Sequence, residues 1–104
     1  MIRAYSGQVT TPNIGDSVLL NVGVPAGQTW IILEIRTPSD VVLESQIVGQ
    51  LNGVIQYEIM PTFNNHDYVI GDTLVGPVDI NFYLHKATAV AQTAGVVVVF
   101  ERPA

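Results

Sequence analysis

The sequence contains no cysteine, few charged residues and no long apolar run. Without cysteine the chain forms neither disulfides nor thiolate metal sites. Its lysine and arginine residues, Arg3, Arg36, Lys86 and Arg102, are spread along the chain, which argues against the basic stripe that nucleic acid phosphates require. No apolar run approaches the roughly 18 residues of a membrane-spanning helix, and the N-terminus lacks the basic-then-apolar pattern of a secretory signal. We therefore expect a soluble protein that starts at its own Met1 and binds neither nucleic acid nor membrane.

The chain is also apolar for its size. Hydrophobic residues make up 48% and charged residues 12%, whereas soluble proteins carry about 25% charged residues. The 104 residues are expected to form one domain, 1–104, because the chain is too short for a second independent core. Since so small a domain leaves much of its surface exposed, the apolar excess predicts that part of this surface is buried against other chains. The expected state is a homo-oligomer.

Two turn signals are clear in the sequence. Asn52-Gly53 lies between two apolar runs and predicts a type I′ hairpin, in which both central residues need a positive φ. Pro25-Ala26-Gly27 predicts a second reversal, because proline presets a negative φ and glycine accepts a positive one.

Short runs rich in Val, Ile, Thr and Tyr predict strands along the whole chain. Residues 87–94 fit either a short helical turn or a loop. The expected strands cover residues 2–9, 17–22, 28–36, 41–51 with a bend at Gly49, 54 to at most 61, 68–70 or 73–75, 78–86 and 95–102. Seven or eight such strands predict an all-β, single-domain antiparallel β-sandwich of the jelly-roll type, although the pattern does not give the strand order.

Alternation along these strands predicts which side chains face the core. In 17–22 it places Val18, Leu20 and Val22 inward and Leu19 outward; in 28–36 it places Ile31, Leu33 and Ile35 inward, and Trp30 and Ile32 outward. In 78–86, Val78, Ile80, Phe82 and Leu84 face inward, and residues 96–100 are apolar on both faces. Apolar side chains on an outer face break the usual pattern and predict a contact surface. The expected oligomer or docking interface consists of Leu19, Trp30, Ile32, Val97 and Val99.

No motif in the sequence predicts catalysis. His66 and His85 are 19 positions apart and do not form a short metal-ligand spacing. The nine acidic residues are dispersed, and no serine lies in a nucleophile elbow such as G-x-S-x-G. Cupin enzymes, which are small jelly rolls, place a metal on a closely spaced histidine pair plus a glutamate, and that pair is missing. We therefore expect no enzyme activity, no cofactor and no metal site.

The most polar stretch, residues 62–68, is the candidate ligand-binding loop. Its oxygen-bearing residues, with Asp72, do not have the spacing of an EF-hand loop. Strand ends and turns explain these residues better than a cation site does. The candidate ligand-binding residues are Asn64, Asn65, His66, Asp67 and Tyr68.

Residues 22–35, VGVPAGQTWIILEI, resemble a short sequence motif found in small structural proteins of bacteriophages and archaeal viruses. In those proteins a V-P-A-G turn leads into a long apolar strand of a jelly roll or sandwich. The resemblance covers 14 of the 104 residues. It implies a virion component, such as a capsid decoration, spike or minor capsid protein, commonly trimeric or pentameric and bound to capsid or other virion proteins.

Three functions follow as hypotheses. The first is a non-catalytic structural protein of the virion, which acts through homo-oligomerisation and docking on a protein lattice. The alternative is a glycan- or receptor-binding β-sandwich that uses the polar loop. The third is a small metal-dependent enzyme that uses His66 and His85.

Overall fold

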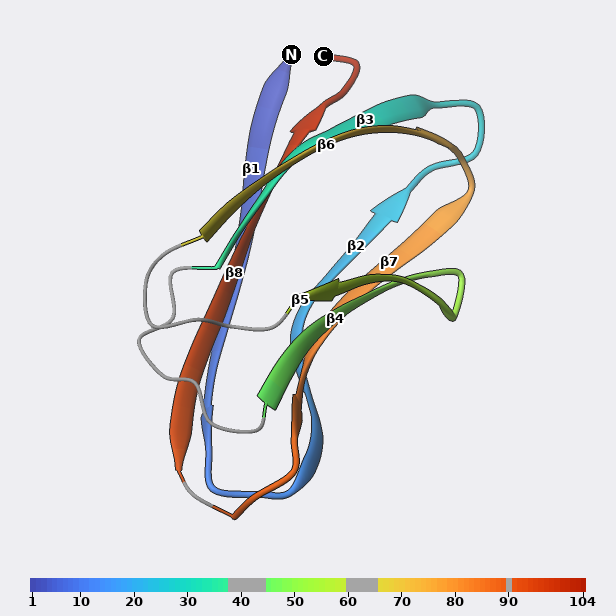
Figure 1. The fold of residues 1–104 in the computed structure, drawn as a ribbon. Coiled ribbons are helices and arrows are strands. Elements are labelled where there is room, and N and C mark those ends of the chain that lie inside the picture. Colours follow the sequence, from blue (N-terminus) through green and yellow to red (C-terminus); the bar gives the residue numbers. More distant parts are fainter. Residues whose placement is uncertain (38–44, 60–65, 90) are drawn as a thin grey trace.

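The computed structural model describes residues 1–37, 45–59, 66–89 and 91–104, which form eight strands (Figure 1). None of the residues described forms a helix that is long and apolar enough to cross a membrane. The strands are β1 (Ile2–Thr11), β2 (Gly15–Val24), β3 (Thr29–Thr37), β4 (Ser45–Leu51), β5 (Val54–Ile59), β6 (His66–Val75), β7 (Val78–Lys86) and β8 (Gln92–Glu101).

The strands form two antiparallel sheets with the orders β1-β8-β3-β6 and β2-β7-β4-β5, here called sheet A and sheet B. The first strand pairs with the last, β2 with β7, β3 with β6 and β4 with β5. The chain is therefore one long antiparallel ribbon that folds over so that its two sheets face each other, which is the jelly roll. The predicted all-β sandwich of eight strands is confirmed.

Both turn predictions are confirmed. Asn52 and Gly53 have φ values of 51° and 80°, as a type I′ turn requires. Gly27 has a φ of 83°, and the Gln28 amide donates to the Pro25 carbonyl oxygen at 3.2 Å. The register of β4 and β5 shifts next to Gly49, where the bend was predicted.

The strand predictions differ from the structure mainly at strand ends. β7 has the predicted bounds, and its alternation is as predicted. The two short alternatives at 68–70 and 73–75 belong to one strand, β6, which passes through Gly71 with a φ of 84°. In the stretch left open, β8 begins at Gln92. The predicted strand over 41–51 lies in part outside the described residues.

The alternation predicted for β2 is wrong at Leu19, because the strand carries a β-bulge there. Val18 pairs with Tyr83 and Leu20 with Phe82, so Leu19 has no residue opposite it. The extra residue reverses the alternation of the side chains. Leu19 therefore turns into the core, whereas Val18 is 64% exposed.

A second bulge, at Leu33 in β3, makes the prediction for Trp30 and Ile32 wrong. The pairing of β3 with β8 skips one residue between Ile32 and Glu34. On the N-terminal side of this bulge Trp30 and Ile32 face inward, with exposed fractions of 2% and 0%, while Ile31 is half-buried. Leu33 is also half-buried rather than in the core.

The inner faces of the two sheets form one apolar core. At one end the Trp30 ring stacks on Tyr5, with centroids 6.1 Å apart, and meets Phe100 edge-on at 5.3 Å. At the far end of β7 the buried side chain is a cation, Lys86, which is 1% exposed. The buried cluster consists of Leu19, Val22, Val24, Trp30, Ile32, Ile35, Ile47, Leu74, Ile80, Phe82, Leu84, Ala94, Val96, Val98 and Phe100.

Candidate functional site

Between the sheets, the described residues pack apolar side chains into one buried cluster. Among the described residues, no group of three or more His, Asp or Glu side chains could hold a metal ion.

The two histidines lie in different sheets. His85 is on the outer face of β7, and its Nδ1 is 2.6 Å from Oδ1 of Asp16. His66 begins β6 of sheet A, where it pairs with Thr37. A site that joins His66 and His85, as the enzyme hypothesis requires, has no support in this arrangement.

The candidate ligand-binding loop is in part a strand. Asp67 and Tyr68 pair in β6 with Arg36 and Ile35 of β3. Asn64 and Asn65 lie outside the described residues. The possible ligand-binding role of these residues stays a prediction.

The residues predicted for the oligomer interface are mostly buried within one chain. Leu19, Trp30 and Ile32 belong to the core, so they cannot contact another subunit in this structure. Val99 is on the outer face of sheet A but is only 9% exposed. Val97, also on that face, is half-buried and is the most accessible of the five.

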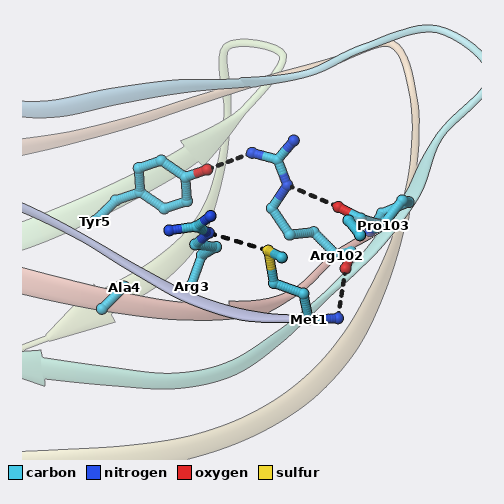
Figure 2. Close-up of a pocket in the computed structure, with 7 residues that line it drawn as sticks. Met1, Arg3, Ala4, Tyr5, Arg102 and Pro103 are labelled. Atoms are coloured by element: carbon cyan, nitrogen blue, oxygen red, sulfur yellow. Dashed lines mark hydrogen bonds between the residues drawn. The ribbon is translucent and has the colours of Figure 1, made fainter.

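Arg102 covers the Trp30 end of the core. Its guanidinium carbon lies 4.3 Å from the centre of the Trp30 ring, and its Nη1 donates a hydrogen bond to the Tyr5 hydroxyl. The Trp30 indole N–H donates to Oε1 of Gln28 at 2.8 Å. Figure 2 shows the Arg102 side chain extending toward the Tyr5 hydroxyl. A hollow of about 320 Å³ lies here, lined by residues 1, 3–5 and 102–104. Because the guanidinium contacts Tyr5, Trp30 and the Pro103 carbonyl, we interpret Arg102 as a structural cap on this end of the core.

Figure 1 shows the β2–β3 turn, the β4–β5 hairpin and the β6–β7 connection at one end of the sandwich, here called the turn end. Val75 closes β6 and is 69% exposed, and Val54 opens β5 and is 59% exposed. Ile55 follows in the hairpin and is 47% exposed. Exposed apolar groups on a small domain mark a contact surface when they cluster.

An open depression of about 490 Å³ lies at the same end, lined by Gly23, Val24, Asn52, Pro77, Val78 and Asp79. Its shape is fixed by the hairpin, because Asn52 and Asp79 exchange two hydrogen bonds. The Asn52 amide donates to the Asp79 carbonyl oxygen, and the Asp79 amide donates to Oδ1 of Asn52, both at 2.8 Å. The turn end thus combines a hydrogen-bonded hairpin with exposed apolar side chains.

The outer face of sheet B is more polar. Asn21, Asn81 and Gln50 lie side by side across β2, β7 and β4, and Gln50 donates to the Tyr83 hydroxyl at 3.5 Å. Oδ1 of Asn81 is buried and has no hydrogen-bond partner in the part of the chain that the structure describes.

The sandwich is closed on one side by a contact between two edge strands. The Tyr57 hydroxyl in β5 donates to Oδ2 of Asp72 in β6 at 2.7 Å. Burial, followed by this hydrogen bond and the charge of Asp72, raises the pKa of Tyr57 well above its ordinary value. The phenol therefore stays protonated and keeps donating in alkaline solution.

The sequence interpretation missed these contacts for identifiable reasons. Lys86 lies two residues after Leu84 in β7, on the same face of the strand. Its burial could therefore be predicted from the alternation that placed Leu84 inward. The contact of Tyr57 with Asp72, and that of Arg102 with Trp30, depend on the strand order. No local pattern signals either.

No family model matches this chain, and no curated protein matches its sequence. Among solved structures the chain is similar to those of infectious bursal disease virus strains Gt and Gx, each with a TM-score of 0.44 and 10% identity, over 97% and 98% of this chain. It is also similar to the VP2 subviral particle of that virus, with a TM-score of 0.43 and 12% identity over 97% of this chain. The chain spans about a third of the length of these solved chains, 32% to 33%. The expected resemblance to bacteriophage and archaeal virus proteins stays a prediction.

Proposed function

We propose that this chain is a non-catalytic structural protein of a virus particle, located in the virion as a decoration, spike or minor capsid component. The observation that carries the proposal is the apolar turn end of a jelly roll whose described inner faces form a buried apolar cluster. Double-sheet jelly rolls occur in viral capsid proteins, lectins and cupins. A cupin-type enzyme would need metal ligands between the sheets, and the described inner faces supply apolar side chains instead. Docking through the surface is the use that this architecture favours.

The proposed mechanism is burial of apolar area with shape complementarity. Removing one exposed Val or Ile side chain from water contributes about 1.5–3 kcal/mol. Val54 and Val75 are each exposed by more than half, so each can contribute in this way. A stable protein interface covers roughly 1,200–2,000 Å² in total, so the adjoining depression is included in the contact. We propose that this surface joins copies of the chain into a trimer or pentamer and docks them on other virion proteins.

Solution mass tests the assembly through this surface. We compare wild type with the double variant Val54→Asp/Val75→Asp, using light scattering after size exclusion. Val18→Asp is the matched control, because Val18 is 64% exposed on β2 far from the turn end. The double variant should lose the trimer or pentamer, and the control should keep it. An unchanged mass for the double variant would contradict the assembly surface.

The virion location has its own test. Virus particles from the source of this sequence are purified on a density gradient, and their proteins are quantified by mass spectrometry. The chain should co-sediment with the particles at a fixed molar ratio to the most abundant protein. Recovery only in the fractions without particles would contradict a structural role.

The outer face of sheet B favours a second candidate, a glycan-binding module. Its amide side chains and the half-buried Tyr83 offer hydrogen bonds and a ring, which are the groups that sugars use. Screening on a glycan array, with Tyr83→Ala as the control, tests this candidate. Binding that Tyr83→Ala leaves unchanged would contradict it.

A further inference from the structure

The inner face of sheet A ends in two arginines. Arg3 pairs with Phe100 across β1 and β8, and residues opposite each other in an antiparallel pair have their side chains on the same face. Phe100 is fully buried in the core, so Arg3 extends from the core side of the sheet, two residues before Tyr5. Arg102 lies two residues after Phe100, and its guanidinium covers Trp30. The apolar inner face is therefore followed by a pair of cations.

Both arginines line the hollow of about 320 Å³ at this end of the sandwich, and the structure describes all of its lining residues (Figure 2). Within sheet A the described chain is interrupted beside Thr37, His66 and Gln92. Thr37 lies six residues along β3 from Ile31, which pairs with Glu101, and Gln92 is at the far end of β8. At about 3.3 Å for each residue of a strand, these interruptions are roughly 20 Å or more from the hollow.

The side chains of the hollow carry positive charge in an acidic chain. The chain has four Lys and Arg residues against nine Asp and Glu residues, and two of the four cations line this hollow. Arg36 pairs with a glutamate at 2.9 Å, whereas neither Arg3 nor Arg102 pairs with a carboxylate in the described part of the chain. Glu101 precedes Arg102, so it extends from the other face of the strand, 3.8 Å from the Met1 amino group. Two like charges at one hollow repel each other unless a negative charge offsets them.

The arginines also leave hydrogen-bond donors available at the hollow. A guanidinium has five N–H donors and no acceptor. Arg102 uses Nε for the Pro103 carbonyl oxygen and Nη1 for the Tyr5 hydroxyl, and its Nη2 has no partner among the described residues. Arg3 uses Nε for the Met1 sulfur, a weak acceptor, and neither of its terminal nitrogens has a partner there. Free donors on two cations are suited to an acceptor that carries negative charge.

Arg102 is ordered before any ligand binds. Its guanidinium carbon lies 4.3 Å from the centre of the Trp30 ring, and two hydrogen bonds fix the plane of the group. Trp30 belongs to the buried cluster, and Tyr5 packs against that cluster. A side chain that is already ordered loses little conformational entropy on binding. The fold thus fixes one of the two cations, while Arg3 is exposed and free to adjust.

We propose that this hollow binds a single phosphate group through Arg3 and Arg102. A phosphate monoester carries about 1.5–2 negative charges at neutral pH and has three strong acceptor oxygens, so it can accept from two guanidinium groups at once. A carboxylate carries one charge, and one guanidinium matches both of its oxygens. Ligand pockets have volumes of about 300–1,000 Å³, so a hollow of this size admits a phosphate with a small organic group.

Two arginines suffice for one phosphate but not for a nucleic acid, whose backbone requires a stripe of cations. The other two cations are not available to extend the site, because Lys86 is 1% exposed and Arg36 is paired with Glu34. The ligand is therefore inorganic phosphate or a small phosphorylated molecule. The site shares no residue with the apolar surface at the turn end, so the inference is independent of the proposed function.

The fluorescence of Trp30 tests the site directly. Trp30 is the single tryptophan and lies under the Arg102 guanidinium, so an anion bound to Arg102 changes its emission. Potassium phosphate is titrated into the protein at neutral pH, with potassium chloride at equal ionic strength as the reference. Phosphate should give a saturable change with half-saturation at millimolar concentration, and chloride should give none. Equal effects of the two salts would overturn the proposal.

Arg3→Gln and Arg36→Gln form a matched pair of variants. Each removes one positive charge from the chain, but only Arg3 lines the hollow. Arg3→Gln should weaken phosphate binding roughly tenfold or more, since it removes charge-assisted hydrogen bonds, and Arg36→Gln should leave the affinity unchanged. Arg3 is exposed, so the circular dichroism of Arg3→Gln should match wild type. Equal affinities of the two variants would show that binding follows net charge and not this hollow.

Three ligands identify the chemistry and the source of the phosphate group. Acetate should bind much more weakly than phosphate, and equal affinities would overturn the phosphate assignment. Tighter binding of glycerol phosphate than of inorganic phosphate assigns the site to a phosphorylated small molecule, and the reverse order assigns it to inorganic phosphate; either order supports the site. Val54→Asp/Val75→Asp should bind phosphate as wild type does, whatever its oligomeric state. Loss of binding in that variant would place the anion at the turn end and overturn the inference.

Discussion

The Lys86 ammonium donates a hydrogen bond of 2.7 Å to the carbonyl oxygen of Thr11, and the lysine side chain is 1% exposed. This contact ties the end of β7 in sheet B to the end of β1 in sheet A. Because a buried acceptor that loses its donor keeps the cost of desolvation, the contact matters more when broken than its net contribution suggests.

Lys86→Met should therefore destabilise the fold by about 1–3 kcal/mol, since the methionine fills the space of the stem but leaves the Thr11 carbonyl without this donor. Urea unfolding followed by circular dichroism measures the change in free energy. His85→Gln, at the neighbouring exposed position, is the control and should change stability by less than about 0.5 kcal/mol. Equal stability of Lys86→Met and wild type would show that the hydrogen bond to Thr11 is not needed.

Tyr57 gives the protein a stability loss in alkaline solution. The folded pKa of this phenol lies above its unfolded value of about 10, so the folded chain holds a proton that the unfolded chain releases. The contribution is fully present below the unfolded pKa and declines as the pH rises above it.

Urea midpoints measured over a series of alkaline pH values should fall more steeply for wild type than for Tyr57→Phe. Below about pH 9, Tyr57 of the wild type is protonated in both the folded and the unfolded chain. In that range the variant should lose only the hydrogen bond to Asp72, about 1 kcal/mol of stability. Parallel pH curves for the two proteins would contradict the raised pKa.

Trp30→Ala should unfold or strongly destabilise the monomer, by about 3–5 kcal/mol, because the ring is 2% exposed and contacts Tyr5 and Phe100. This outcome separates the core position from the outer-face position that the alternation predicted. Thermal unfolding gives the measurement. If the variant keeps wild-type stability and loses only its oligomer, Trp30 contributes to the interface and not to the core.

Arg102→Met tests the cap over this ring. The variant removes the cation from the ring face and the donor from the Tyr5 hydroxyl, which should cost about 1–2 kcal/mol. The fluorescence of Trp30, the single tryptophan of the chain, should change because its surroundings change. Arg3→Met is the matched control, since Arg3 is exposed and its Nε donates to the Met1 sulfur. Identical emission spectra for Arg102→Met and wild type would contradict the cap.

The sequence predicted which residues form strands and turns better than it predicted which side chains face the core. Asn52-Gly53 and β7 were predicted correctly because their signals are local: a turn that needs two positive φ values, and an unbroken alternation from Val78 to Leu84. Leu19, Trp30 and Ile32 were misplaced because one extra residue at a bulge reverses every side chain on one side of it. The residues that flank a bulge do not reveal it, because the cause is the pairing with another strand.

The candidate surfaces were harder to predict than the fold. Val54 and Val75 are 21 positions apart, and their common end of the sandwich follows only from the strand order. Arg3 and Arg102 likewise lie near opposite ends of the chain, and they line one hollow only because β1 pairs with β8. Long-range pairing thus decides which apolar or charged groups share a surface.

The ribbon arrangement has a consequence for synthesis of the chain. β8 lies between β1 and β3 in sheet A, so β1 has its ladder partner only when β8 has been made. Until residue 101 leaves the ribosome, β1 has both edges unpaired and β3 lacks one neighbour. Folds with such long-range pairing form slowly and expose aggregation-prone strands meanwhile. A nascent chain of this protein cannot complete its core step by step, and chaperone binding during translation would protect β1 until β8 arrives.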